Sequence, residues 1–189
     1  MSRVTVVQIG LGTVGGEVIS QVVANRERWR SVLGRDVRIG AVIGTGGAVL
    51  AEGPDGLADD LLLRLVHARR EGTALHEAAA GHELVDPAEA IAVLVNQGPV
   101  VVMDAAAGDQ TAPLHARALS SGARVVLSNK APLALPLGNP LAALSTARVC
   151  AQATAPEPGS APITTSATGS APAAAAAPGA EAPACTTPG

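Results

Sequence analysis

The fold is decided by the stretch VVQIGLGTVGGEV, residues 6–18, in which an apolar run leads into glycines. Gly10, Gly12 and Gly15 have the spacing G-x-G-x-x-G, and the residues after them have helical periodicity. A buried strand that turns through such glycines into a helix is the arrangement that binds the pyrophosphate of a dinucleotide cofactor. It presents the unpaired N–H groups of the helix N-terminus to the phosphates. The cofactor-binding residues predicted here are Gly10, Leu11, Gly12, Thr13, Val14 and Gly15.

Outward from this motif, residues 1–148 alternate apolar strand-like runs with helix-like segments. This alternation predicts an α/β domain with a doubly wound, Rossmann-like parallel sheet. The glycine-rich stretch GTGGAVLAEGPDG, residues 44–56, is predicted to be a long connection. The predicted strands are 3–9, 37–44, 99–106 and ARVVLSNK at 123–130. Four helices are predicted: one directly after the glycines, one over 57–70, one that begins after Asp86, and one over 112–121.

Local signals predict the ends and faces of these helices. Asp86 is a predicted N-cap, because Pro87 stands at the first helical position and Glu89 is placed as in a capping box. In the helix after the glycines, apolar residues recur at spacings that share one face. We expect that face to pack on the sheet through Val14, Val18, Ile19, Val22 and Val23.

Composition excludes several classes of protein. The 189 residues have a net charge of −3, and beyond Arg26, Arg28 and Arg30 no basic cluster marks a nucleic-acid surface. No apolar stretch reaches the ~18 residues of a membrane span, so we expect a cytoplasmic protein with no membrane partner. Cys150 and Cys185 have no metal-like spacing, which predicts neither a metal site nor a disulfide framework. The histidines share no spacing either and are predicted to lie at the surface: His67, His76, His82 and His115.

The amino-acid composition of the chain changes near residue 150. From there it consists almost entirely of Ala, Pro, Ser, Thr and Gly, without periodicity. Repeated proline excludes helix and central strand, and few large apolar side chains are present to offset the entropy of ordering. We therefore predict a cofactor domain over 1–148 and a disordered tail over 149–189.

The residues that would bind the adenosine ribose do not decide between NAD and NADP. The fingerprint places an acid about 20 residues after the glycines, at the end of the second strand. Asp36 nearly satisfies the count but precedes that strand. At the end of the strand stand Gly44, Thr45 and Gly46, with neither an acid for a ribose hydroxyl nor an arginine for a 2′-phosphate. The predicted cofactor is NAD or NADP.

Four segments together resemble the nucleotide-binding half of homoserine dehydrogenase. They are IGLGTVGGEV at 9–18, GTGGAVLAEGPDGL at 44–57, VVVMDAAAGDQTAPLHARALSSGARVV at 100–126 and LSNKAPLA at 127–134. The resemblance implies an NAD(P)-dependent oxidoreductase that interconverts aspartate 4-semialdehyde and L-homoserine, on the route to threonine, methionine and isoleucine. It also implies a small-molecule substrate and a homo-oligomeric protein.

The resemblance also implies roles for particular residues. Lys130 matches the lysine of the family's Asn-Lys motif, beside the nicotinamide and the substrate, and is the predicted catalytic and cofactor-contacting residue. Asn129 is expected to orient the loop or to contact the cofactor. Ala105 and Ala106 match a stretch near the nicotinamide ribose. Asp104 is expected to end a strand and to bond backbone groups, and a role as an acid–base residue is the alternative.

The second half of the family pattern is not found in this sequence. The motif E-A-x-V-G-G-G-I-P is absent, and only residues 151–154 resemble it faintly, with Gln152 where an acid is expected. The tail is expected to be either a shortened form or the product of a displaced reading frame over GC-rich coding sequence, and the composition favours the latter. We therefore expect cofactor binding with impaired catalysis, and no dimer-forming region.

Two other functions fit parts of the sequence. One is an NAD(P)-binding module without turnover, which would signal through a partner. The other is a phosphorylating aldehyde dehydrogenase with Cys150 as nucleophile, since such enzymes also begin with a glycine fingerprint. Cys185 is a poorer candidate, because no histidine follows it to act as base.

Overall fold

The computed structural model describes residues 2–129 and 131–134. Several predictions lie outside these residues: the role of Lys130, the domain boundary at 148, the disorder of 149–189, and the roles of Cys150 and Cys185. The described residues form one α/β layer structure, which is the fold class expected from the sequence.

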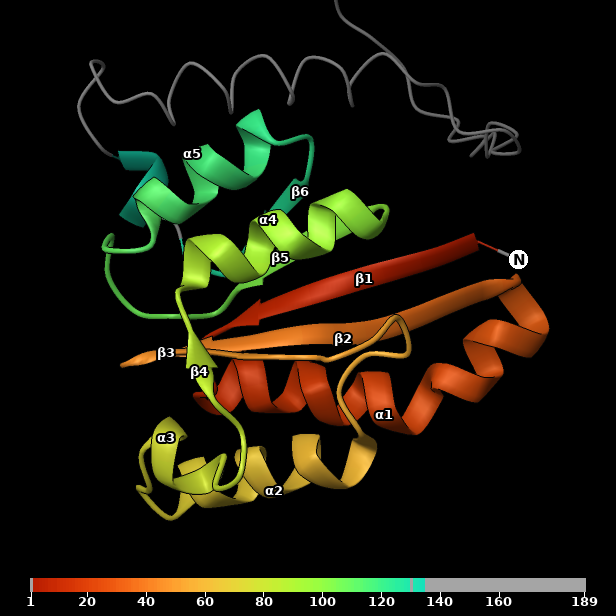
Figure 1. Ribbon diagram of the computed structural model, residues 1–189, viewed down its shortest axis with the longest axis horizontal. Coiled ribbons are helices and arrows are strands. Elements are labelled where there is room, and N and C mark those ends of the chain that lie inside the picture. The colour runs from red at the N-terminus through yellow and green to blue at the C-terminus, as the bar shows by residue number, and fades with distance from the viewer. Residues whose placement is uncertain (1, 130, 135–189) are drawn as a thin grey trace, which may run out of the picture. The chain divides into compact units, whose positions relative to one another are not determined.

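A six-stranded sheet in the order β4-β3-β2-β1-β5-β6 forms the middle layer (Figure 1). The pairs β2–β1, β1–β5 and β5–β6 are parallel, so the strands on either side of β1 are wound as expected. Helices α1 and α2 cover one face of the sheet, and α4 and α5 cover the other. The strands are β1 (Ser2–Ile9), β2 (Arg35–Gly44), β3 (Gly47–Leu50), β4 (Leu84–Val85), β5 (Val100–Asp104) and β6 (Arg124–Leu127), and the helices are α1 (Thr13–Leu33), α2 (Asp59–Arg70), α3 (Leu75–Ala78), α4 (Pro87–Gln97), α5 (Ala112–Ser120) and the 3₁₀ turn η1 (Ala131–Ala134).

The prediction that 44–56 is a long connection was wrong. Gly46 and Gly47 have φ angles of 97° and 146°, which only glycine adopts readily, and they turn the chain back beside β2. Strand β3 then pairs antiparallel with β2, and β4 pairs antiparallel with β3. The sheet is therefore mixed, with two short antiparallel strands at one edge.

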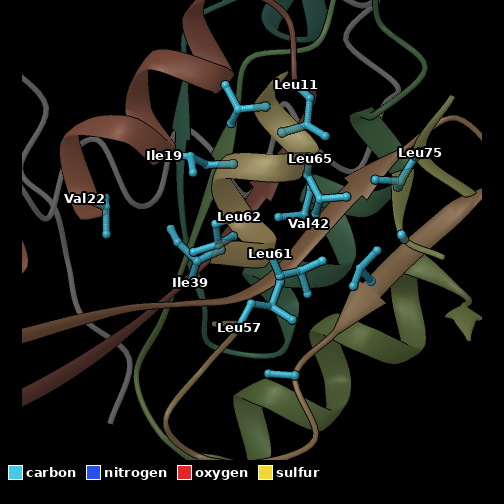
Figure 2. Packing of buried hydrophobic residues seen from close by; sticks show 14 of the residues in the cluster. Leu11, Ile19, Val22, Ile39, Val42, Leu57, Leu61, Leu62, Leu65 and Leu75 are labelled. Atoms are coloured by element: carbon cyan, nitrogen blue, oxygen red, sulfur yellow. The ribbon is translucent and has the colours of Figure 1, made fainter. Parts of the chain in front are cut away.

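Two apolar cores lie on opposite faces of the sheet, and β2 contributes to both. Ile39 and Val42 pack with α1 and α2, whereas Ala41 and Ile43 pack with α4 and α5. Figure 2 shows the first core, in which the leucines of α2 gather against side chains of β2 and α1. Trp29, the single aromatic residue, packs at its margin. Aliphatic side chains thus supply nearly all of the buried volume.

The predicted face of α1 is correct at its centre and wrong at its start. Ile19 and Val22 are buried, and Val18 and Val23 are partly buried. Val14, however, is 50% exposed, because the residues that approach the sheet in the first turn are glycines rather than Val14. The predicted cap of α4 is confirmed: Oδ1 of Asp86 accepts hydrogen bonds from the backbone N–H groups of Ala88 and Glu89, at 2.9 and 3.0 Å.

Asp36 anchors the end of the sheet where β1 and β2 begin. It is buried, and its carboxylate contacts Arg38 at 2.8 Å, Arg3 at 3.3 Å and Arg30 of α1 at 3.4 Å. Burial by itself raises the pKa of Asp36, but the hydrogen bonds and charges of the arginines outweigh it, so the pKa lies below its ordinary value. The sequence-based exclusion of Asp36 as a ribose-binding acid agrees with this position, at the opposite end of β2 from the glycine turn.

We expect Asp36→Asn to lower the free energy of unfolding at pH 7 by about 1–2 kcal/mol. The loss is limited because the arginines that lose their carboxylate partner are partly solvated. A depressed folded-state pKa stabilises the fold above the unfolded pKa, and this stabilisation is lost as the pH falls below about 4. The difference between the two proteins should therefore shrink in acid. Urea unfolding at pH 7 and pH 3 measures it.

Asp55→Asn is the matched control. Asp55 contacts the same Arg3 at 3.6 Å, but its side chain is 83% exposed. A surface pair of this kind contributes little, so the control should stay within about 0.5 kcal/mol of the unchanged protein. Equal losses in both variants would show that burial of Asp36 has no particular importance.

Candidate dinucleotide-binding site

The glycines of the turn between β1 and α1 have different structural roles. Gly10 has a φ of 81°, and its N–H donates to the Ile43 carbonyl of β2 at 2.9 Å. A Cβ at Gly10 would lie 2.8 Å from the backbone nitrogen of Ala106. Gly10 is thus required both by its backbone angle and by the close approach of the segment after β5.

Gly15 is required by packing inside the turn. A Cβ at this position would lie 2.0 Å from the Gly10 carbonyl oxygen and 2.9 Å from Nε2 of Gln8. Gln8 is fully buried, and its side-chain amide donates to the carbonyls of Ile9 and Gly10 at 3.1 Å each. Sequence reasoning missed Gln8, although a polar residue in an otherwise apolar strand is a visible signal. It supplies a donor to the Gly10 carbonyl, whereas the Ile9 carbonyl also accepts from the Ala105 N–H at 2.9 Å.

Gly12 differs from both neighbours. Its φ of −64° suits any residue, and a Cβ there would meet no atom within 4 Å. It is the N-cap of α1, and the helix start has no side-chain cap hydrogen bond and no acidic residue in its first turn. Open space therefore lies beside the start of a helix whose first N–H groups carry the positive end of the helix dipole. This geometry suits a phosphate group.

The other predicted residues of this motif lie around the helix start. The side chain of Leu11 is buried in the first core, so Leu11 has only its backbone to offer a ligand. Thr13 and Val14 are exposed in the first turn of α1. The predicted cofactor-binding residues of this motif therefore lie close together, but some of them pack inside the protein and others are exposed.

A loop of residues 105–111 joins β5 to α5 and lies against the glycine turn. Asp104, at the end of β5, is buried, and its Oδ1 accepts from the Ala106 N–H at 2.7 Å. Its Oδ2 accepts from the Thr111 hydroxyl at 2.5 Å. The prediction that Asp104 ends a strand and bonds backbone groups is confirmed. Its carboxylate ties both ends of the loop.

The prediction that His115 lies at the surface was wrong. Its side chain is fully buried in α5, with Nε2 located 2.7 Å from Oδ2 of Asp104. Burial raises the pKa of Asp104, but the contacts with His115, Thr111 and the Ala106 N–H outweigh this effect and leave the pKa below its ordinary value. The burial of His115 could have been predicted from its helical spacing relative to Ala112 and Leu119, which lie on the buried face of α5. His67, His76 and His82 are exposed, as predicted.

Asn129 joins the end of β6 to the same loop. Its side-chain amide donates to the carbonyls of Ala106 and Gly108 at 3.3 and 2.6 Å, and its Oδ1 accepts from the Ala131 N–H at 3.0 Å. These bonds agree with the expectation that Asn129 orients the loop. The carboxyl ends of β1, β5 and β6 are thereby connected, at the edge where α/β sheets bind ligands.

Two classes of feature are missing from the part of the chain that the structure describes. Within it, no group of three or more His, Cys, Asp or Glu side chains could hold a metal ion. None of its helices combines the length and hydropathy needed to cross a membrane.

Parallel strands, a glycine turn and an open helix start define a Rossmann-like dinucleotide-binding domain. The family model described as "Homoserine dehydrogenase, NAD binding domain" matches residues 10–151, and the chain belongs to this family. The predicted resemblance and the predicted cofactor, NAD or NADP, agree with that family. The match favours it over the phosphorylating aldehyde dehydrogenases.

Solved structures with this fold include two homoserine dehydrogenases. A hyperthermophilic archaeal homoserine dehydrogenase in complex with NADPH is 22% identical, with a TM-score of 0.56, and the match covers 77% of this chain and 41% of that one. A putative homoserine dehydrogenase from Archaeoglobus fulgidus is 24% identical, with a TM-score of 0.50 and coverage of 78% and 40%. This chain thus spans about two fifths of their length. No curated protein matches the sequence.

The steric difference between Gly15 and its neighbour Gly16 can be tested by measuring the free energy of unfolding of alanine variants. Gly15→Ala should lower the free energy of unfolding by about 3 kcal/mol or more, because its Cβ would overlap the Gly10 carbonyl. In Gly16→Ala the Cβ would lie 3.2 Å from Cγ1 of Val66, and the gain in helix propensity of about 1 kcal/mol offsets this approach. Gly16→Ala should therefore remain within about 1 kcal/mol of the unchanged protein. Denaturant unfolding of both variants measures this, and equal effects would contradict the described packing.

Proposed function

We propose that this chain is the NAD(P)-binding part of a homoserine dehydrogenase, which interconverts aspartate 4-semialdehyde and L-homoserine in amino-acid biosynthesis in the cytoplasm. The observation that supports it most is the open helix start at Gly12, within the region that matches the family. The substrate rests on the family alone, since none of the described residues is assigned to hold it.

In this proposal the pyrophosphate binds at the start of α1. The phosphates approach the backbone at Gly12 and accept hydrogen bonds from N–H groups of the first turn, including those of Thr13 and Val14. Gly10 and Gly15 keep the turn tight behind them, and Leu11 contributes its backbone. No acidic side chain of the first turn repels the phosphates.

The nicotinamide end is proposed to lie over the loop after β5. Ala105 and Ala106 would face the ribose through their backbone, and Asn129 would hold the loop in place. Lys130 is the proposed catalytic residue: its ammonium group would hydrogen-bond the substrate oxygen and take part in its proton transfer. The bound cofactor would supply or accept the hydride at the carbon that bears this oxygen.

Gly12→Ala tests the proposal at its most specific point. Because its Cβ meets no protein atom, the variant should fold, with a loss of about 1 kcal/mol at most for an N-cap alanine. The same Cβ would occupy the space that a phosphate needs. We expect the Kd for NADH and NADPH to rise about tenfold or more, measured by calorimetry.

Gly53→Ala is the matched control for that titration. Gly53 also has open space around the position of a Cβ, but it lies between β3 and α2. The Gly53→Ala variant should bind both cofactors with the same affinity as the unchanged protein. Homoserine-dependent reduction of NAD or NADP then tests turnover: turnover would contradict the module alternative, binding without turnover agrees with the impaired catalysis expected of this chain, and absence of binding contradicts the proposal.

The turn after β2 generates a prediction about cofactor choice. Thr45 is exposed between Gly44 and Gly46, and neither an acid nor a base stands at residues 44–47. We propose that NADH and NADPH bind with similar affinity. In Thr45→Asp the new carboxylate would repel the 2′-phosphate and accept hydrogen bonds from ribose hydroxyls. The Kd for NADPH should rise about tenfold or more while that for NADH stays equal or falls.

Thr45→Asn separates charge from shape in this experiment. Asparagine has the size of aspartate without its charge, so its effect on the two affinities should be about equal. The same shift toward NADH in both variants would show that the turn does not act on the 2′-phosphate by charge.

A further inference from the structure

We infer that His115 is a positioning residue of the cofactor site, which acts through Asp104 on the loop of residues 105–111. The inference rests on the proposed dinucleotide binding, which it deepens by identifying what holds one wall of the site in place. His115 is fully buried in α5, so it cannot touch a bound cofactor itself. Any effect it has on binding passes through its neighbours.

The contact with Asp104 explains why an imidazole occupies this position. Nε2 of His115 lies 2.7 Å from Oδ2 of Asp104, a short contact that pairs the imidazole with the carboxylate. Both ring nitrogens are buried, and among the described residues neither has a hydrogen bond of regular geometry, so the contact at Nε2 is close in distance without being aligned as a hydrogen bond. An unpaired buried nitrogen is unfavourable, and an aliphatic side chain would fill the space without it. The chain thus keeps a histidine here at a cost in packing, which indicates that the contact at Nε2 is what matters.

The carboxylate of Asp104 connects this contact to the loop. Oδ1 accepts from the Ala106 N–H near the start of the loop, and Oδ2 accepts from the Thr111 hydroxyl at its end. His115 holds Oδ2 from the side of α5 and so fixes the plane of the carboxylate. A rotation of this carboxylate would release one end of the loop.

The loop has almost no freedom to shift without effect on the glycine turn. The Ala106 nitrogen lies 2.8 Å from the position of a Cβ at Gly10, so the two backbones are in contact. Asn129 holds the opposite side of the loop through the carbonyls of Ala106 and Gly108. A loop released at Asp104 would therefore move the wall of the proposed cofactor site rather than a remote surface segment.

The test compares His115→Leu with His115→Gln in the full 189-residue chain, with NADPH as the probe. Leucine fills the buried space but has no donor for Asp104, whereas the glutamine amide can donate from about the position of Nε2. We expect His115→Leu to raise the Kd for NADPH about tenfold and His115→Gln to remain within about threefold of the unchanged protein. If His115 served packing alone, the order would be reversed, because leucine suits an apolar interior better than an amide.

Two further variants complete the experiment. His67→Leu, at an exposed histidine of α2, should leave the Kd unchanged. If His115→Leu does not fold, Thr111→Val removes the other donor to Oδ2 with little change of volume, and it should raise the Kd in the same direction. If the unchanged chain binds NADPH and a folded His115→Leu binds it equally well, the inference is overturned while the proposed function stands; the same holds if His115→Leu does not fold and Thr111→Val leaves binding unchanged. If the unchanged chain does not bind NADPH, both are overturned.

Discussion

The structure depends on a contact between backbones at the carboxyl edge of the sheet. The turn after β1 lies so close to the loop after β5 that a Cβ at Gly10 would be 2.8 Å from the Ala106 nitrogen. Inside the turn, a Cβ at Gly15 would be 2.0 Å from the Gly10 carbonyl. Only residues without side chains allow helix, strand and loop to meet at these distances. Gly12, between Gly10 and Gly15 in the sequence, has open space around the position of a Cβ.

Two buried carboxylates fix opposite ends of the sheet in different ways. Asp36 lies where β2 begins and is paired with arginines of β1, β2 and α1, so it joins three elements by charge. Asp104 lies where β5 ends, and its partners are a backbone N–H, a hydroxyl and an imidazole. In both cases the partners outweigh the burial of the acid and lower its pKa. The first arrangement stabilises the layers, and the second shapes a loop beside the open helix start.

The family membership and the geometry support different parts of the functional proposal. The geometry at Gly12 concerns a phosphate group and would serve any dinucleotide. The proposed reaction with homoserine rests on the family alone, because solved structures at 22–24% identity share only the fold. Experiments on cofactor affinity and on turnover therefore address separate questions. The network at Asp104, Asn129 and His115 connects them, since it holds the loop on which the nicotinamide is proposed to lie.

Local features of this protein were determined by the sequence itself. The strand, glycine turn and helix at 6–18 and the cap at Asp86 depend on backbone angles and on neighbours within a few residues, so they can be predicted from the pattern. The pairing of β3, the exposure of Val14 and the burial of His115 were decided only by tertiary structure. A glycine-rich stretch does not reveal that a partner strand lies beside it, and a histidine does not reveal that a buried carboxylate from another element lies 2.7 Å away. These outcomes depend on which surfaces the other elements present, and no local periodicity contains that information.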